Sequence, residues 1–373
     1  MRNITCLQII RLFLNNSISI LIIGPLQRIQ KKFLQLGFTS AKIKSNIKTK
    51  GELFMAKYKM ILDLDTGVDD ALALAYALAT PECDLIGVVA SFGNIVPEEA
   101  AQNTLNLLEM LGHPEVPVFI GATHSSHTDH FEVMPISQTI HGKNGIGEVE
   151  VPTAKRKIES QNGIDFYIEA AHKYQGQLLI VPTGPLTNLA AAIEKDPEII
   201  DLIGHVTLMG GALTVPGNVN PVTEANINQD PPAADKVLRS KLPLTMVGLD
   251  VTLRTLLTKK ETQKWREIGT TSATKYADIV DYYINAYKIT SPHLHGCGLH
   301  DPLAVAAAVD PSLLQTIYLN MKVDTEGAYA GRTIGDETRL NEPATTTQVA
   351  INVDVPRFLD MFMTKLSAFF KEH

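Results

Sequence analysis

The chain has 373 residues, of which 45% are hydrophobic, 6% aromatic and 20% charged, and its formal net charge is −7. This composition is typical of a globular protein and excludes the collagen-like, intrinsically disordered and disulfide-scaffold classes. The three cysteines are too few and too scattered for a disulfide framework or a Cys-based zinc site, and no apolar run reaches the ~18–20 residues of a membrane span, so we expect a cytoplasmic protein without a membrane partner.

Positive charge is concentrated at the start of the chain. Residues 1–54 contain nine Lys or Arg and one acidic residue, whereas the remainder is acidic. We interpret this segment as a misassigned start upstream of Met55, as a targeting segment, or as a true extension of the protein. The acidic remainder has no basic stripe, so nucleic acid is not an expected partner.

From residue 59 onward, short apolar runs alternate with helical stretches. The sequence predicts a strand at 60–65, a helix at 69–79, a strand at 85–90, a helix at 97–111 and a strand at 116–120. Further strands are predicted at 177–181, 205–209 and 244–249, each followed by a turn and a helical segment, and a late helix opens at His300.

This alternation predicts the fold class. Strands that are apolar throughout belong to parallel sheets covered on both faces. The sequence therefore predicts an α/β fold with a doubly wound, mostly parallel sheet and helices on both faces. With no internal repeat and no low-complexity linker, we expect one domain over residues 57–373.

Polar residues collect where the predicted strands end. The first strand runs into 63–70 (DLDTGVDD), the second into 91–94 (SFGN), and later ones into 182–185 (PTGP) and 209–211 (MGG). In open parallel sheets, ligands bind outside the carboxyl ends of the strands. We therefore expect the functional site at this edge.

Four aspartates within eight residues favour a metal site over helix capping. Capping would account for one or two acids at the surface, where each adds ~0.3–1 kcal/mol. It does not account for a set between an apolar strand and an apolar helix, where like charges need a compensating cation. Carboxylates, amides and carbonyls suit Ca²⁺ or Mg²⁺ rather than zinc, and Val68 stands where an EF-hand loop requires glycine.

Two enzyme classes fit the first motif. In a haloacid-dehalogenase-like phosphatase, Asp63 would be the nucleophile and Asp65 the acid/base, but a convincing lysine motif is missing. The full stretch 63–70 instead resembles the D-x-D-x-G-x-D-D motif of the nucleoside hydrolases (inosine–uridine preferring nucleoside N-ribohydrolases). Further blocks resemble that family in order: 91–94, 140–147 (IHGKNGIG), 181–188 (VPTGPLTN), 208–211 (LMGG), Asn218 with 224–226 (EAN), and 300–302 (HDP).

The resemblance implies a ligand set and a base. It assigns Ca²⁺ to Asp65, Asp70, Asp301 and the backbone carbonyl of Thr183. The ion would hold a water and the 2′ and 3′ hydroxyls of the ribose, and Asp65 would accept the proton of that water.

The same resemblance assigns the remaining roles. Its implied ribose and substrate contacts are Asp69, Asn94, Met209, Asn218, Glu224 and Asn226, with His141 as a candidate for the base pocket. His300 is the candidate acid for the departing base. Tyr287 aligns with an aromatic residue of the family, and Ser291 stands where some purine-preferring members carry arginine, so the base preference is left open.

The resulting expectation is Ca²⁺-dependent hydrolysis of ribonucleosides (of inosine, uridine, cytidine or adenosine type) to ribose and a free base, in nucleoside salvage or catabolism. The transition state would resemble the ribosyl cation of glycoside hydrolysis. A non-catalytic nucleoside-binding protein on the same fold is the alternative class. We also expect a homo-oligomer, either a dimer or a tetramer.

Overall fold

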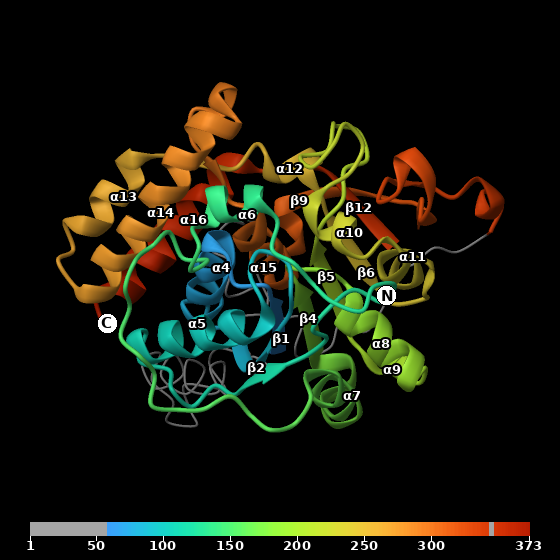
Figure 1. Cartoon of the computed structure of the whole chain (residues 1–373), viewed down its shortest axis with the longest axis horizontal. Helices are drawn as coiled ribbons and strands as arrows, with labels where there is room; N and C mark the ends of the chain where they lie inside the picture. Colours follow the sequence, from blue (N-terminus) through green and yellow to red (C-terminus); the bar gives the residue numbers. More distant parts are fainter. Residues whose placement is uncertain (1–57, 343–346) are drawn as a thin grey trace, which may run out of the picture. The chain divides into compact units, whose positions relative to one another are not determined.

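Within residues 58–342 and 347–373, the parts of the chain that the computed structural model describes, eight strands form the central sheet (Figure 1). In sheet order they are β3 (Val118–Ile120), β2 (Cys83–Ala90), β1 (Tyr58–Leu64), β4 (Leu178–Pro182), β5 (His205–Met209), β6 (Leu244–Val247), β12 (Thr347–Val353) and β9 (Leu314–Tyr318). All neighbours pair in parallel except β12 and β9, which are antiparallel. The predicted doubly wound, mostly parallel α/β fold is confirmed.

Helices cover the two faces of the sheet and enclose two hydrophobic cores. Met60, Leu62 and Leu64 of β1 belong to one core, whereas Ile61 belongs to the other. This alternation follows from the two-residue period of a strand. The first core contains residues of α4 (Val68–Leu78), α5 (Pro97–Met110), α13 (Lys259–Arg266), α14 (Thr271–Thr290), α15 (His300–Val309) and α16 (Val355–Phe370), and the second those of α7 (Gly163–Tyr174), α8 (Thr187–Lys195), α9 (Ile199–Leu202) and α11 (Pro231–Arg239).

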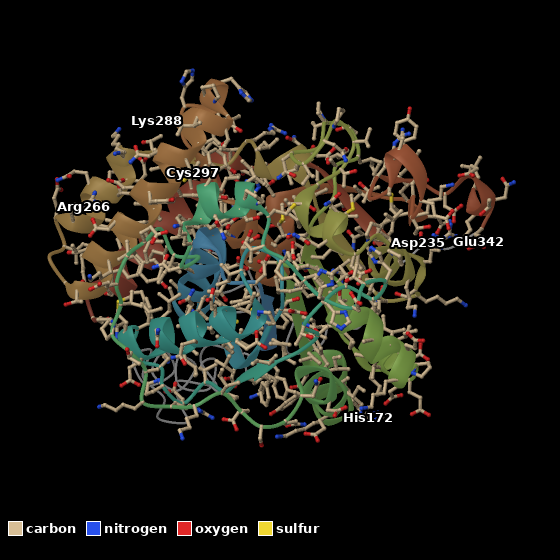
Figure 2. All side chains as sticks on the ribbon, viewed as in Figure 1. His172, Asp235, Arg266, Lys288, Cys297 and Glu342 are labelled. Carbon is tan, nitrogen blue, oxygen red and sulfur yellow. The ribbon has the colours of Figure 1, made fainter. Side chains whose placement is uncertain are left out.

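Shorter elements complete the connections. They are α6 (Pro135–His141), α10 (Ala225–Gln229), α12 (Leu249–Thr252), β7 (Leu256–Leu257), β8 (Cys297–Gly298), β10 (Met321–Val323), β11 (Thr333–Gly335) and the 3₁₀ turns η1 (Gln175–Gln177), η2 (Pro292–Leu294), η3 (Pro311–Leu313), η4 (Gly327–Tyr329) and η5 (Glu337–Arg339). Charged side chains such as those of Asp235 and Arg266 lie at the periphery of Figure 2.

The strand order reverses between β1 and β4. From β1 the sheet continues through β2 and β3 on one side and through β4, β5 and β6 on the other. At such a reversal the connecting helices leave toward opposite faces, which opens a crevice at the carboxyl ends of the two strands. The fold thus places the residues that follow β1 and β4 at the rim of one crevice.

The predicted strands and helices are all present, with small shifts at their ends. The strand predicted at 116–120 begins at Val118, because Pro117 has no N–H for regular pairing. The strand predicted at 244–249 ends at Val247, because Gly248 is already the N-cap of α12.

The contact pattern separates residues 57–373 from residues 1–56. The predicted segment 1–54 lies outside the described residues. No helix in the described part of the chain is long and apolar enough to cross a membrane.

Candidate active site

Asp65, the residue after β1, is held by the loop that follows β2. The backbone N–H of Asn94 donates to Asp65 Oδ2 at 2.7 Å, and Asn94 Nδ2 donates to Oδ1 at 3.0 Å. Gly93, with φ of +150°, lies so close that a Cβ there would be 2.0 Å from Asp65 Oδ2. Each carboxylate oxygen keeps lone pairs for another partner, so Asp65 is oriented without being saturated.

Asp70, in the first turn of α4, is bound from three directions. The N–H of Gly67 donates to Oδ2 at 2.8 Å, the Thr183 hydroxyl donates to Oδ1 at 2.7 Å, and Asn94 Nδ2 approaches Oδ2 at 3.4 Å. Asn94 thus lies between Asp65 and Asp70. Thr183 follows β4, so this contact joins the two strands at the crevice.

Asp69 has one oxygen without a donor. The Tyr283 hydroxyl donates to Asp69 Oδ2 at 3.2 Å, whereas the buried Oδ1 has no hydrogen-bond partner among the described residues. An unpaired buried carboxylate oxygen is costly, and native structures rarely leave one without a ligand. This atom therefore indicates a missing cation or hydroxyl group.

Asp301 completes a cluster of possible metal ligands. One carboxylate oxygen each from Asp69, Asp70 and Asp301 can be chosen so that all lie within 4.8 Å of one another, and all three residues are buried. Asp65 lies outside this set of three, although Asn94 links it to Asp70. In the part of the chain that the structure describes, no lysine or arginine forms an ion pair with these carboxylates.

The acidic cluster carries excess negative charge in a buried place. Burial and the charge of Asp70 raise the pKa of Asp69 to about 7. Burial raises the pKa of Asp65 and of Asp301 well above the ordinary value, with further increases from neighbouring aspartates. A divalent cation would remove both causes, because it replaces the lost hydration and neutralises the charge. The donor set, all oxygen, fits a hard cation.

Glu224 is the N-cap of α10, and Asn226 lies in the first turn of that helix. The Glu224 carboxylate accepts the N–H groups of Gly211, Asn226 and Ile227 at 2.9, 2.9 and 3.2 Å. Burial raises the pKa of Glu224.

Asn226 joins α10 to the ends of two strands. Its Nδ2 donates to the carbonyl of Thr183 at 2.7 Å and to that of Met209 at 3.1 Å, and it lies 3.3 Å from Met209 Sδ. The Thr183 carbonyl, which the resemblance assigns to the metal, thus already accepts one hydrogen bond and keeps a second lone pair.

Asn218 is the predicted site residue that the structure leaves at the surface. Its side chain is exposed, and its Oδ1 accepts the N–H of Ala225 at 3.0 Å. Asn218 therefore contacts the start of α10 but does not enter the buried cluster.

His300 is buried between two hydroxyl groups. Its Nε2 lies 2.6 Å from the Tyr287 hydroxyl, and its Nδ1 lies 2.8 Å from the Thr252 hydroxyl. The Tyr283 hydroxyl lies 3.5 Å from that of Tyr287 and also reaches Asp69, so hydroxyl groups connect His300 with the acidic cluster. Burial lowers the pKa of His300 to about 4.

His141, at the end of α6, faces the start of α4. Its Nδ1 accepts the N–H of Val68 at 3.1 Å and lies 3.8 Å from Asp69 Oδ1. Because Nδ1 accepts, the neutral ring carries its proton on Nε2. Burial lowers the pKa of His141 to about 3, and its ring packs against Tyr283 with centroids 5.3 Å apart.

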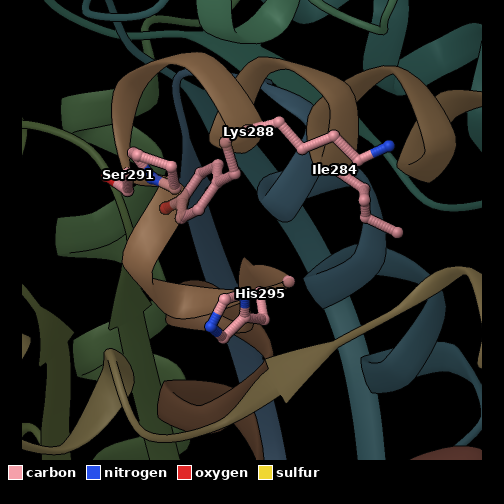
Figure 3. Close-up of a pocket in the computed structure, with 7 residues that line it drawn as sticks. Ile284, Lys288, Ser291 and His295 are labelled. Atoms are coloured by element: carbon pink, nitrogen blue, oxygen red, sulfur yellow. The ribbon is translucent and has the colours of Figure 1, made fainter.

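A cavity of about 270 Å³ lies beside Tyr287 (Figure 3). Ser291 and His295 contribute to its wall from the end of α14 and the segment after it, and Lys288 and Ile284 complete the labelled lining. His295 adopts a left-handed backbone conformation with φ of +57°. Tyr287 both lines this cavity and contacts His300, so it links the cavity wall to the candidate acid.

Sequence reasoning missed two groups and left a third without a role. Thr252 was missed because α12 has no motif, and Tyr283 because its position on an apolar helix face resembles core packing. Asp63, the first aspartate of the motif, is turned to Tyr167 and Asn188, which donate to it at 2.8 and 3.0 Å. Its carboxylate is therefore fully engaged away from the acidic cluster.

This arrangement brings together a candidate site for a hard cation, a candidate carboxylate base and a chain of hydroxyl groups that ends at His300. A family model described as inosine-uridine preferring nucleoside hydrolase matches residues 60–360. The probable uridine nucleosidase 2 of Arabidopsis thaliana is 36% identical over 315 residues, which are 83% of this chain and 97% of that protein. The pyrimidine-specific ribonucleoside hydrolase RihA of Enterobacter sp. (strain 638) is 33% identical over 311 residues, 83% of this chain and 98% of that protein.

Solved structures show the same likeness. A purine-preferring ribonucleoside hydrolase from Gardnerella vaginalis superposes with a TM-score of 0.84 at 58% sequence identity, covering 84% of this chain and 100% of that one. The plant nucleoside hydrolase PpNRh1 gives a TM-score of 0.79 at 31% identity, covering 84% and 100%.

Proposed function

Because the chain belongs to the inosine–uridine preferring nucleoside hydrolase family, and is thus an enzyme that hydrolyses the N-glycosidic bond of ribonucleosides, we propose that it does so with a bound Ca²⁺ ion and a preference for purine nucleosides. The observation that carries the metal assignment is the buried set of Asp69, Asp70 and Asp301, whose carboxylates form no ion pair with a lysine or arginine among the described residues.

In this proposal Asp65, Asp70, Asp301 and the Thr183 carbonyl hold the ion. When bound, Ca²⁺ would supply Lewis-acid activation of a water molecule and a grip on vicinal hydroxyls. The residues around it are suited to that task because Asn94 and Gly67 orient two of the carboxylates through N–H groups rather than through competing cations.

Asp65 acts as the general base. Asn94 fixes both carboxylate oxygens, so the carboxylate has a single orientation in which to receive the proton of the attacking water. A positioned base of this kind contributes about 10²–10⁴-fold to a rate.

The ribose is bound between the acidic cluster and α10. Asp69 Oδ1, which has no donor among the described residues, accepts a ribose hydroxyl. The amide nitrogens of Asn94 and Asn226 are used by protein acceptors, which leaves their carbonyl oxygens for the sugar. Glu224 and Asn218 complete the predicted sugar contacts, with Asn218 acting from the exposed loop before α10.

Leaving-group departure is assisted by His300 together with Tyr287. The Tyr287 hydroxyl lies 2.6 Å from His300 Nε2, and Tyr287 also lines the cavity at the end of α14, so we assign that cavity to the departing nucleobase. His141, on the other side of Tyr283, contributes to the pocket for the base.

The purine preference is supported by the Gardnerella vaginalis relative, which is named a purine-preferring ribonucleoside hydrolase and is 58% identical to this chain. Relatives named for uridine and pyrimidine nucleosides are only 36% and 33% identical. The test is release of reducing sugar from inosine, uridine and cytidine. We expect turnover of all three, with the highest kcat/KM for inosine. A higher kcat/KM for uridine would contradict the preference, and turnover of none would favour the non-catalytic nucleoside-binding class.

The products, ribose and a free base, suit nucleoside salvage, which we propose as the role of the reaction. The cytoplasmic location and the dimeric or tetrameric assembly stay predictions.

A further inference from the structure

Thr252 is a buried threonine whose hydroxyl faces the proposed acid. It ends α12, the four-residue helix that follows β6, and its side chain is fully buried. Its Oγ1 lies 2.8 Å from His300 Nδ1 and has no other hydrogen-bond partner among the described residues. A buried hydroxyl directed at one ring nitrogen does more than fill space, because it fixes which atom of the ring faces it.

His300 is held at opposite edges of its ring. Nδ1 contacts Thr252 and Nε2 contacts Tyr287, so a 180° flip of the imidazole would place carbon atoms against both hydroxyls. Gly298 packs on the same ring, since a Cβ there would lie 2.5 Å from Nε2. The ring therefore has one orientation that satisfies its neighbours, and Thr252 supplies half of the hydrogen bonding that selects it.

We propose that Thr252 is a positioning residue for departure of the nucleobase: its hydroxyl holds the His300 ring so that Nε2 stays on the hydroxyl of Tyr287, a residue that lines the cavity. The inference rests on the proposed role of His300. Thr252 acts through His300, whereas Asp65, the proposed general base, follows β1.

Thr252→Val tests the inference because valine keeps the volume and removes the hydroxyl. With inosine we expect kcat to fall about 3- to 10-fold, the net worth of one hydrogen bond, at nearly unchanged KM. With p-nitrophenyl riboside, whose phenolate departs without a proton, kcat stays within about twofold by the same argument. Thr252→Ser restores the hydroxyl and should recover most of the inosine rate.

Thr255→Val is the matched control. Thr255 is also a fully buried threonine of this segment, but its hydroxyl donates to the carbonyls of Thr252 and Leu299 at 3.0 and 3.5 Å. Its loss should change the rates with both substrates by the same factor. Thermal melting of each variant shows whether the fold is kept.

A substrate-selective loss for Thr252→Val, absent in Thr255→Val and reversed by serine, supports the inference. An equal loss on both substrates, or no loss on either, overturns it. His300→Ala, measured with inosine and with p-nitrophenyl riboside, separates this failure from that of the proposed function. If His300→Ala loses activity selectively on inosine and Thr252→Val does not, only the role of Thr252 is wrong. If neither variant is selective for a substrate, the role of His300 is wrong as well.

Discussion

The aspartates at the start of the domain are chemically identical but differ in what surrounds them. Asp63 accepts from Tyr167 and Asn188, and burial raises its pKa to about 7. Asp65 accepts from the backbone N–H and the side-chain amide of Asn94 and keeps lone pairs for another partner. We therefore expect substitution at Asp65 to affect catalysis and substitution at Asp63 to affect mainly the fold.

Asp65→Asn is predicted to lower kcat by about 10²–10⁴-fold, the usual worth of a positioned general base. The amide keeps the volume and one ligand oxygen but cannot accept the proton of the water. Steady-state kinetics with inosine and with p-nitrophenyl riboside measure the effect, which should be seen on both because water attack is common to them. A variant that retains more than about a tenth of the kcat would exclude Asp65 as the base.

His300→Ala is predicted to separate the two substrates. The loss should be large with inosine, whose base leaves poorly without a proton, and small with p-nitrophenyl riboside. Comparison of kcat on the two substrates is the measurement. An equal loss on both would mean that His300 supports the fold or the metal site, and His141 would be the next candidate for the acid.

The sequence predicted most of the candidate site at this scale, because the acidic residues follow strands whose ends must meet at one edge. It did not predict the partners of those residues. Thr252 and Tyr283 reach His300 and Asp69 only through packing between elements far apart in the chain, and neither belongs to a local motif. The exposure of Asn218 likewise depends on the path of a loop.

At the scale of elements, the turn after β2 determines how close the second strand can approach the first. Gly93 has φ of +150°, and a Cβ on it would lie 2.0 Å from Asp65 Oδ2. Only glycine combines this backbone conformation with room for the neighbouring carboxylate.

Gly93→Ala should therefore displace Asp65 and abolish most activity, whereas Gly269→Ala should not. Gly269 also has a positive φ, of +82°, but nothing lies within 4 Å of a Cβ there. The control thus carries the backbone strain without the clash. Inosine turnover and melting temperature of both variants provide the comparison, and similar activities would refute the steric argument.

The central strands were predictable because each is apolar along its whole length and is followed by a turn. Strands β12 and β9 were not predicted. β9 lies at the sheet edge with most of its residues partly or fully exposed, so its sequence lacks the continuous apolar pattern. In β12, partly or fully exposed positions interrupt the buried ones, so its sequence also lacks a continuous apolar pattern.

For the whole molecule, the acidic cluster makes stability depend on pH and metal. The pKa values of Asp65, Asp69 and Asp301 are raised in the folded protein. Above about pH 6.5 the folded metal-free protein therefore binds protons that the unfolded chain has already lost, and removal of those protons at higher pH favours unfolding. The stability of the metal-free protein should then fall as the pH rises. His141 and His300 have lowered pKa values in the folded protein, so they reduce its stability only below about pH 6.5, where the unfolded chain would protonate them. They therefore do not oppose this trend.

Thermal melting of the metal-free protein between about pH 6.5 and pH 8.5 measures the slope. We expect the melting temperature to fall with pH, and Ca²⁺ to raise it most at the alkaline end, more effectively than Zn²⁺. A melting temperature that is independent of both pH and Ca²⁺ would show that the carboxylates are compensated in some other way.

A protein that begins at Met55 is predicted to fold and to keep its kcat, because every candidate site residue lies between Asp65 and Asp301 and residues 57–373 form a separate unit. Soluble yield and inosine turnover test this. Loss of soluble protein on truncation would show that residues 1–54 contribute to folding.

Ribose release from inosine by the enzyme stripped of metal, assayed before and after addition of Ca²⁺, tests directly whether the reaction depends on the ion. We expect little ribose from the metal-free enzyme and recovery of turnover with Ca²⁺, because the buried carboxylates around Asp70 need a cation. Full activity without metal, or no ribose in the presence of Ca²⁺, would contradict it.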